Sequence, residues 1–466
     1  MKSLKKLAMA STMVLLCSSA AAELGDYTLE ETIGNLFVAP PADNPVTPEQ
    51  ETGPYPLIGD PEGHDDGFNP LDYFAWQAVT LHPSTGASCG NGSPYRFFVN
   101  RVPNTRNMVV YFEGGGACWD FETCSGAAGD LGARNPNGIP LDYLGSGRFD
   151  TDLVSPFVFR LNPLPLSQVK TQAWTIVYVP YCTGDVYSGD SVAVYPDPDG
   201  GPSLMWQHNG LRNVRAMIAW LKNNLERPAQ MLATGCSAGG AGSFINYYHL
   251  RRDMAPTRGF LINDSGPIFP AGTPQAPSRR LHDQIIDAWG LDELSEFGVS
   301  PLEVLQADVP TFDPADLGSL NAGLAEKFPA DRLGHTHFWQ DFNYSRYSYE
   351  RFFDDIINAP TPEEAEFRIR IRWYFDTVAL VKAIAPQPNF GIYVPNFRDL
   401  NDSHCATIVD FRRGDIQESA LELNDFINNV LDVDAVGPVL QGVERDWRPD
   451  LLRPRDPLYE LIDAGL

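Results

Sequence analysis

Apolar residues are grouped along the chain in short runs, and one longer segment repeats them with the spacing of a helix face. That segment is 210–224, where apolar side chains recur every three or four positions. The short runs are separated by turn residues and predict strands. The predicted strands cover residues 76–81, 95–100, 108–112, 174–179, 231–233, 259–262, 335–340 and 390–395. Strands interleaved with helices predict an α/β fold, with a mostly parallel central sheet flanked by helices.

Two regions depart from this pattern. Residues 23–70 are rich in Pro, Gly, Asp and Glu, which predicts an extended arm. Residues from about 267 to 331 are rich in Pro, Leu and acidic residues and have weak periodicity, which predicts a cap-like insertion over a site. We expect residues 71–466 to form a single catalytic domain that contains this insertion.

The first 22 residues have the three parts of a signal peptide. Lysines at 2, 5 and 6 precede an apolar centre, Leu7 to Leu16, and the small residues Ala20 to Ala22 follow it. The segment is too short to span a membrane, and no later apolar run is long enough to do so. We therefore expect cleavage after residue 22 and a secreted or periplasmic protein.

The net charge of the chain disfavours some classes of binding partner and substrate. The chain has 34 basic and 60 acidic residues, a formal net charge of −26 at pH 7. Such a charge disfavours nucleic acids and anionic membranes, and it favours a neutral or esterified substrate over a densely charged polyanion. The acidity is equally consistent with a saline habitat. The oligomeric state is not predicted by the sequence.

A candidate nucleophile lies in Gly235-Cys236-Ser237-Ala238-Gly239, between an apolar run and a helical pattern. A sharp strand-to-helix turn with small flanking residues is the nucleophile elbow of a serine hydrolase. The motif alone is equally consistent with a glycine-rich turn. A second motif favours the elbow, because the predicted strand 108–112 leads into Gly114, Gly115 and Gly116. Amides of Gly115, Gly116 and Ala238 are the expected oxyanion hole.

The candidate base is His404, which follows the last predicted strand. A serine that comes first and a histidine that comes last are in the chain order of α/β-hydrolases. The other histidines are in less suitable contexts, namely an acidic segment, a helical pattern, or positions close to the serine or to a strand: His64, His82, His208, His249, His282, His335 and His337.

Six cysteines remain after the signal peptide, an even number that predicts three disulfides in an exported chain. About fifteen pairings are possible. Ser237 and His404 must lie in hydrogen-bonding reach, so their neighbours Cys236 and Cys405 are a candidate pair, an arrangement that resembles tannase-like and feruloyl esterases. Closeness in sequence favours Cys118 with Cys124, which leaves Cys89 with Cys182.

Neither a metal nor a cofactor is expected. His335 and His337 share one face of a predicted strand, but no cluster of further ligands accompanies them. Residues 197–200 resemble part of a calcium loop without its remaining ligands, and a turn explains them better.

Five ordered segments resemble the pectin acetylesterase and Notum carboxylesterase family. They are 89–94, 113–118, 180–189, 235–240 and 263–266, and the resemblance covers about residues 75–410. It implies an α/β-hydrolase-like fold, a Ser-Asp-His triad and cofactor-free hydrolysis of carboxylic esters. The chain departs from the family at Gly116-Ala117, where members often have a tryptophan, so the mouth of the pocket is expected to differ.

The acid of the triad is the remaining assignment. Asp341 follows the predicted strand 335–340, lies between serine and histidine in the chain, and is where the resemblance implies the acid. Asp264 is the alternative, while Asp354, Asp355 and Asp376 lie in helical contexts. The expected activity is removal of acetyl groups from a polysaccharide. The alternatives are an esterase or lipase for another acyl ester, and a catalytically silent protein that binds a saccharide or acyl group.

Overall fold

The computed structural model describes residues 57–59, 66–144, 153, 155–159, 169–398, 400–412 and 414–444. The predicted signal peptide and most of the predicted arm therefore lie outside the described residues. No helix among the described residues combines the length and the apolar character that crossing a membrane requires.

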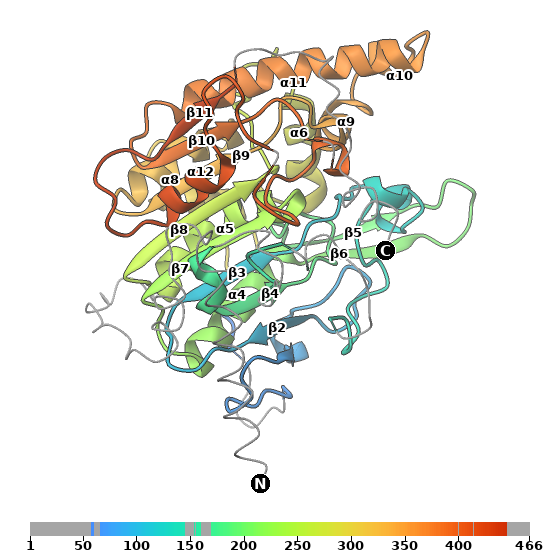
Figure 1. The fold of residues 1–466 in the computed structure, drawn as a ribbon. Coiled ribbons are helices and arrows are strands. Elements are labelled where there is room, and N and C mark those ends of the chain that lie inside the picture. The colour runs from blue at the N-terminus through green and yellow to red at the C-terminus, as the bar shows by residue number, and fades with distance from the viewer. Residues whose placement is uncertain are drawn as a thin grey trace.

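Within the described residues, nine strands form one sheet in the order β1-β2-β4-β3-β7-β8-β9-β10-β11 (Figure 1). Strand β2 is antiparallel to β1 and β4, and the other neighbours in the sheet are parallel. The strands are β1 (Trp76–Thr80), β2 (Arg96–Asn100), β3 (Met108–Phe112), β4 (Thr175–Val179), β7 (Gln230–Cys236), β8 (Arg258–Asp264), β9 (Arg332–Thr336), β10 (Phe390–Val394) and β11 (Gln441–Val443). The predicted mostly parallel sheet is confirmed.

Helices pack against this sheet and against one another. Helix α5 lies against β3, β7 and β8, α4 packs on α5, and α12 lies against β8, β9 and β10. The helices are α3 (Phe121–Cys124), α4 (Gly210–Asn224), α5 (Ala238–Met254), α6 (Arg279–Trp289), α7 (Pro301–Asp308), α8 (Leu320–Lys327), α9 (Phe342–Tyr349), α10 (Asp354–Ile357), α11 (Pro362–Ile384) and α12 (Leu423–Leu431). The helix predicted at 210–224 has these same bounds.

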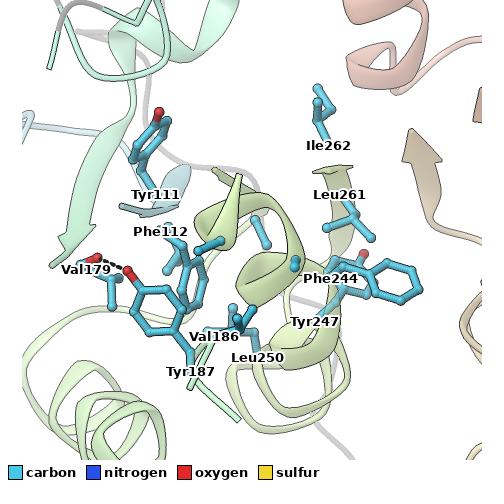
Figure 2. Packing of buried hydrophobic residues seen from close by; sticks show 14 of the residues in the cluster. Tyr111, Phe112, Val179, Val186, Tyr187, Phe244, Tyr247, Leu250, Leu261 and Ile262 are labelled. Carbon is cyan, nitrogen blue, oxygen red and sulfur yellow. Dashed lines mark hydrogen bonds between the residues drawn. The ribbon is translucent and has the colours of Figure 1, made fainter. Parts of the chain in front are cut away.

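Burial explains why the central strands are continuously apolar. Every residue of β3, β4 and β10 is buried, as expected for parallel strands covered on both faces. Around β3, Phe112 and Tyr187 meet edge to face with ring centroids 4.9 Å apart, and Tyr187 Oη donates to Val179 O (Figure 2). This core lies directly beneath the loop that follows β3.

The segment predicted as a cap-like insertion contains helices rather than irregular chain. Helices α6, α7 and α8 lie between β8 and β9. Ser300 and Glu303 form a capping box at the start of α7. The helical pattern expected around His282 is α6, whereas α7 and α8 were not predicted because each is only eight residues long.

The two motifs with a partial resemblance to metal sites make local hydrogen bonds in the fold. Strands β5 (Ser191–Tyr195) and β6 (Leu204–His208) form a separate hairpin, and residues 197–200 make a turn in its loop. His335 Nε2 and His337 Nδ1 lie 2.8 Å apart, and His337 Nε2 lies 3.0 Å from Thr377 Oγ1. The facing ring nitrogens of these two histidines are thus occupied by one another.

Candidate active site

Ser237 lies between β7 and α5 in a strained turn. Its φ of 59° and ψ of −125° place it outside the regions that non-glycine residues prefer, a conformation that costs about 1–3 kcal/mol. Ser237 N donates to Asp264 O at 2.9 Å, and Ser237 O accepts from Ala241 N at 3.0 Å. The strand-turn-helix geometry is that of a nucleophile elbow.

Gly235 and Gly239 allow this turn to approach β3. A Cβ atom on Gly239 would lie 2.1 Å from Phe112 O, and one on Gly235 would lie 2.4 Å from the same oxygen. Both distances are far below van der Waals contact, so any side chain at either position would push the elbow away from β3. The glycines of the motif therefore serve packing between strand, turn and helix.

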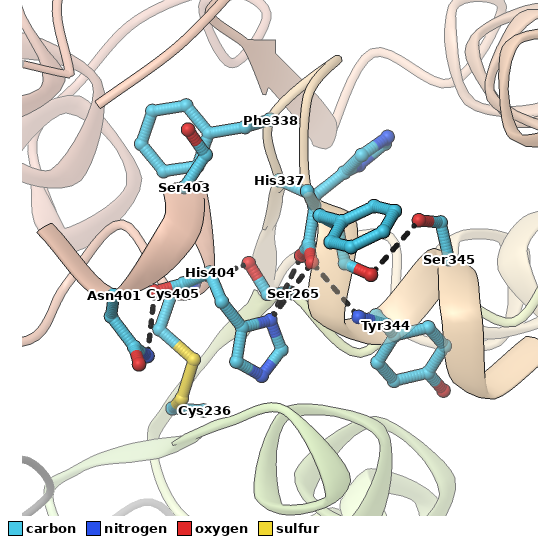
Figure 3. A network of polar contacts seen from close by, with 12 residues as sticks. Cys236, Ser265, His337, Phe338, Tyr344, Ser345, Asn401, Ser403, His404 and Cys405 are labelled. Atoms are coloured by element: carbon cyan, nitrogen blue, oxygen red, sulfur yellow. Dashed lines mark hydrogen bonds and ion pairs between the residues drawn. A yellow bond between two sulfur atoms is a disulfide. The ribbon is translucent and has the colours of Figure 1, made fainter. Parts of the chain in front are cut away.

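His404 and Asp341 form a buried pair. His404 Nδ1 lies 2.9 Å from Asp341 Oδ2 and 3.1 Å from Oδ1, and because a carboxylate only accepts, Nδ1 carries the hydrogen (Figure 3). Asp341 also accepts from Tyr344 N at 2.9 Å and is the N-cap of α9. This interaction leaves Nε2 of His404 as the basic nitrogen.

The secondary structure before Asp341 differs from the prediction. Strand β9 ends at Thr336, so residues 337–340 are a loop and not the end of a strand. Trp339 N and Gln340 N donate to carbonyls of the chain that follows β10. The loop therefore leaves the sheet to begin α9, and the carboxylate stands at a helix start.

Asp264 contacts the loop that carries His404. Its carboxylate accepts from Ala406 N at 2.8 Å, from Thr407 N at 2.7 Å and from Thr407 Oγ1 at 2.7 Å. Burial raises the pKa of Asp264, and the hydrogen bonds from Thr407 and Ala406 oppose that rise. Both carboxylate oxygens of Asp264 therefore bind the segment just after His404, through the amides of Ala406 and Thr407 and the Thr407 hydroxyl.

The His404 loop is strained and held from several sides. Four of its residues adopt positive φ: Asn401, Asp402, Ser403 and Cys405. Arg398, which is buried, donates to Ala406 O at 2.9 Å and to Cys405 O, while Cys405 N donates to Ser265 Oγ at 3.0 Å. Backbone conformations with positive φ at non-glycine residues are strained, and they persist only where surrounding contacts hold them.

Three disulfides join the six cysteines of the described residues, in the pairs named from the sequence. They link Cys89 to Cys182, Cys118 to Cys124, and Cys236 to Cys405. Figure 3 shows the last bridge beside the His404 ring, where it ties the elbow to the histidine loop. Several disulfides in one chain are typical of an oxidising, extracytoplasmic compartment.

A cavity of about 440 Å³ brings the predicted residues together. Ser237, His404, Gly115, Gly116 and Ala238 all line it. Asp341 lies behind His404 and is 1% exposed. Polar side chains form much of the remaining wall: Arg134, Asn343, Tyr344, Tyr347 and Asn401. None of the lining residues comes from 267–331, the segment predicted to be a cap-like insertion.

Sequence reasoning missed several residues of this site. Arg134 follows the short helix α3, and Asn343, Tyr344 and Tyr347 lie on α9, directly after Asp341. Asn343 and Tyr347 are four residues apart directly after the candidate acid, and this helical spacing was a signal that both side chains lie on one face near it. Glu113, a buried carboxylate just before the glycine loop, was also missed, because a charged residue at a strand end usually faces solvent.

The described residues contain two groups with the ligand types of a metal site. They are Cys118, Cys124 and His208, and Cys236, His404 and Cys405. All four cysteines are in disulfides, and the metal ligand is the free thiolate. Neither group fits a resident metal ion in this form.

The sheet order and the elbow are those of the α/β-hydrolase fold. Comparisons with known proteins show which family the chain resembles over part of its length. Residues 72–275 match the model of the pectinacetylesterase family. Pectin acetylesterase 4 of Arabidopsis thaliana is 28% identical over 193 residues, which are 40% of this chain and 42% of that protein. Palmitoleoyl-protein carboxylesterase notum1a of Danio rerio is 24% identical over 179 residues, 38% of this chain and 31% of that protein.

The family resemblance found in the motifs is confirmed, and the chain is a distant homologue of pectin acetylesterases and Notum carboxylesterases. The matched stretches span less than half of these relatives. A crystal structure of the Wnt deacylase Notum from Drosophila aligns with a TM-score of 0.46 at 20% identity, over 69% of this chain and 84% of that one. The family match ends at residue 275, before Asp341 and His404.

Proposed function

We propose that this chain is a serine carboxylesterase that removes acetyl groups from a polysaccharide outside the cytoplasm. The observation that carries the proposal is that His404, paired with Asp341 at 2.9 Å from Nδ1 to Oδ2, lines the same cavity as the strained Ser237 and the glycine loop. Ser237 is the nucleophile, His404 the general base and Asp341 the acid of the triad. Pectin acetylesterase names among the relatives support the acetyl ester.

Acylation follows from this arrangement. Nε2 of His404 takes the hydroxyl proton of Ser237 as Oγ attacks the ester carbonyl carbon, and Asp341 stabilises the imidazolium that forms. The negative charge on the carbonyl oxygen is met by the amides of Gly115, Gly116 and Ala238. Ala238 is the first residue of α5, so the helix N-terminus adds favourable electrostatics there.

Deacylation repeats the same steps with water. His404 gives its proton to the departing alcohol oxygen, and the acetyl group stays on Ser237 Oγ. Water then enters, and its oxygen attacks the acyl carbon as His404 takes one of its protons. The second tetrahedral intermediate collapses to acetate as the bond to Ser237 Oγ breaks, and His404 returns the proton to that oxygen. An alkoxide leaves more readily than an amide anion, which favours esters as substrates.

The character of the cavity supports a small acyl group and a polar alcohol. Polar side chains and glycines line the cavity together with apolar groups such as Leu131 and Val186, and Arg134 is its permanently charged residue. A hydroxyl-rich sugar finds hydrogen-bonding partners on such a wall, whereas a long acyl chain needs an apolar tunnel. The alternative is an ester with a longer acyl group, supported by relatives named palmitoleoyl-protein carboxylesterases.

Acetate release from several acetylated polysaccharides, together with nitrophenyl esters of increasing chain length, tests the proposal. We expect release that is lost in Ser237→Ala, and rates that fall as the acyl chain lengthens. Rates that rise from acetate to octanoate would favour the longer acyl group. Full-length protein that neither turns over any ester nor reacts with a fluorophosphonate would favour a silent binding protein.

The place of action belongs to the same proposal. We propose that residues 1–22 are a cleaved signal peptide and that the chain matures in a secreted or periplasmic compartment, where its disulfides form. N-terminal sequencing of the exported protein is expected to begin at residue 23. Recovery of unprocessed chain in the cytoplasm would contradict this.

A further inference from the structure

A buried carboxylate stands directly before the glycine loop. Glu113 follows the last residue of β3 and precedes Gly114, and it is 0% exposed. Its backbone is fixed at both ends, because Glu113 N donates to Val179 O at 3.0 Å and Glu113 O lies 2.8 Å from Tyr187 Oη, whose one hydrogen it shares with Val179 O.

Every close partner of the Glu113 carboxylate is a donor. Oε1 accepts from Tyr143 Oη at 2.6 Å and from Tyr178 Oη at 3.0 Å, and Oε2 accepts from Tyr181 N at 2.9 Å. The Asn135 amide and the Arg134 guanidinium approach from the loop after α3, at 3.3 Å and 3.4 Å. One side chain thus joins the ends of β3 and β4 to that loop.

Arg134 connects Glu113 to the glycine loop, because it contacts both. A Cβ atom on Gly115 would lie 2.5 Å from Arg134 Cδ, so the stem of Arg134 packs directly on the backbone of Gly115. Gly115 and Gly116 have φ values of 133° and 53°. The loop therefore lacks a regular conformation of its own and takes its shape from what packs around it.

We infer that Glu113 is a positioning residue that fixes the amides of Gly115 and Gly116 for the charge that develops on the ester oxygen. This inference rests on the proposed function. A buried ion pair adds little net stability compared with an apolar cluster. We therefore expect the Glu113 carboxylate to matter for the position of the Gly115 and Gly116 amides and not for stability. Oxyanion donors act only at the right distance, and a shift of about 1 Å costs on the order of 100-fold in rate.

Glu113→Gln tests the inference with a side chain of the same shape. The amide keeps one acceptor oxygen but turns an NH₂ group toward donors, so the anchoring contacts rearrange. We expect kcat for a nitrophenyl acetate to fall by roughly 10- to 100-fold with KM within about twofold. Affinity for a trifluoromethyl ketone, whose adduct carries the oxyanion, should fall by the same factor as kcat/KM.

Asp331→Asn is the matched control. Asp331 is a buried carboxylate with the same kinds of donor: Tyr247 Oη at 2.9 Å, Arg251 Nε at 2.6 Å and Gly259 N at 3.2 Å. It lies at the amino ends of β8 and β9, whereas Ser237 follows the carboxyl end of the parallel strand β7. We expect Asp331→Asn to lower the melting temperature and to leave kcat and ketone affinity unchanged.

The outcomes separate the inference from the proposed function. Wild-type turnover that disappears in Ser237→Ala supports the function, and Glu113→Gln with unchanged kcat and ketone affinity then overturns only the inference. Equal losses in Glu113→Gln and Asp331→Asn would also overturn it, since both would reflect stability. If Glu113→Gln does not fold, Tyr143→Phe removes one donor and should show a smaller loss in the same two readouts.

Discussion

Replacing Asp341 with Asn changes the proposed triad by one atom. The carbonyl oxygen of the new amide can still accept from Tyr344 N, so the N-cap of α9 is retained, whereas Ala at this position would lose the cap at a cost of about 1 kcal/mol. The amide NH₂ faces Nδ1 of His404, which must then accept a hydrogen bond. The ring proton moves to Nε2, where it blocks removal of the Ser237 proton.

The expected loss is large because the wrong tautomer cannot act as base. The same substitution in serine proteases lowers kcat by about 10⁴-fold, which corresponds to about 5.5 kcal/mol of activation free energy. Burial favours a similar magnitude here, since Asp341 is 1% exposed and water cannot easily take the place of its carboxylate.

Steady-state hydrolysis of nitrophenyl acetate measures this loss, with thermal unfolding as the check on folding. Asp264→Asn is the control, because the Asp264 carboxylate contacts backbone after His404 and the Thr407 hydroxyl. Asp341→Asn with activity within about tenfold of wild type and an unchanged melting temperature would refute the reasoning. If Asp264→Asn alone were inactive and folded, the acid would be reassigned.

Three further predictions concern stability. Asp264→Asn should lower the free energy of unfolding by about 1–3 kcal/mol, because its amide leaves a buried backbone donor unpaired, and an unchanged denaturation midpoint would contradict this. Replacing Cys236 and Cys405 by Ser opens a bridge across 169 residues and should cost about 5 kcal/mol, against about 2 kcal/mol for Cys118 and Cys124, six residues apart; equal shifts in guanidinium midpoint would contradict the loop-entropy reasoning. Burial, with Arg279 adding to it, lowers the pKa of His282 to about 4, so this group stabilises the fold above pH 6.5 and the stabilisation is lost as pH falls. His282→Gln should therefore flatten the fall in unfolding free energy between about pH 6.5 and 5.5 by about 1 kcal/mol, and parallel slopes for the two proteins in urea titrations would contradict the assignment.

The sequence predicts most strands of the described sheet because parallel strands covered on both faces are continuously apolar, as in β3 and β10, whereas the three-residue strand β11 was not predicted. It also predicts the partners around Ser237, since the elbow and the glycine loop each have a local pattern. The bounds around Asp341 were wrong, because hydrogen bonds from Trp339 and Gln340 to the chain after β10 end β9 early. The partners in these hydrogen bonds are more than 50 residues away in the chain, so the local sequence around β9 does not reveal them.

Where distant partners fix a residue, the sequence pattern did not show its role: Glu113 was not singled out, and Asp264 was named only as an alternative acid. The buried Glu113 carboxylate accepts from Tyr143 and Asn135, which follow it by 30 and 22 residues, among other partners distant in sequence. Asp264 is anchored by a loop more than 140 residues later. Their environment depends on tertiary structure, and a single sequence without that context favours an exposed carboxylate for both.

The most direct test is to identify the residue that a fluorophosphonate modifies in the oxidised, full-length protein. Mass spectrometry of the digested adduct should place one label per chain on the peptide that contains Ser237, with loss of acetate release in proportion to labelling and no label in Ser237→Ala. A label on another residue that inactivates the enzyme, or full acetate release after Ser237 is modified, would contradict the proposed mechanism.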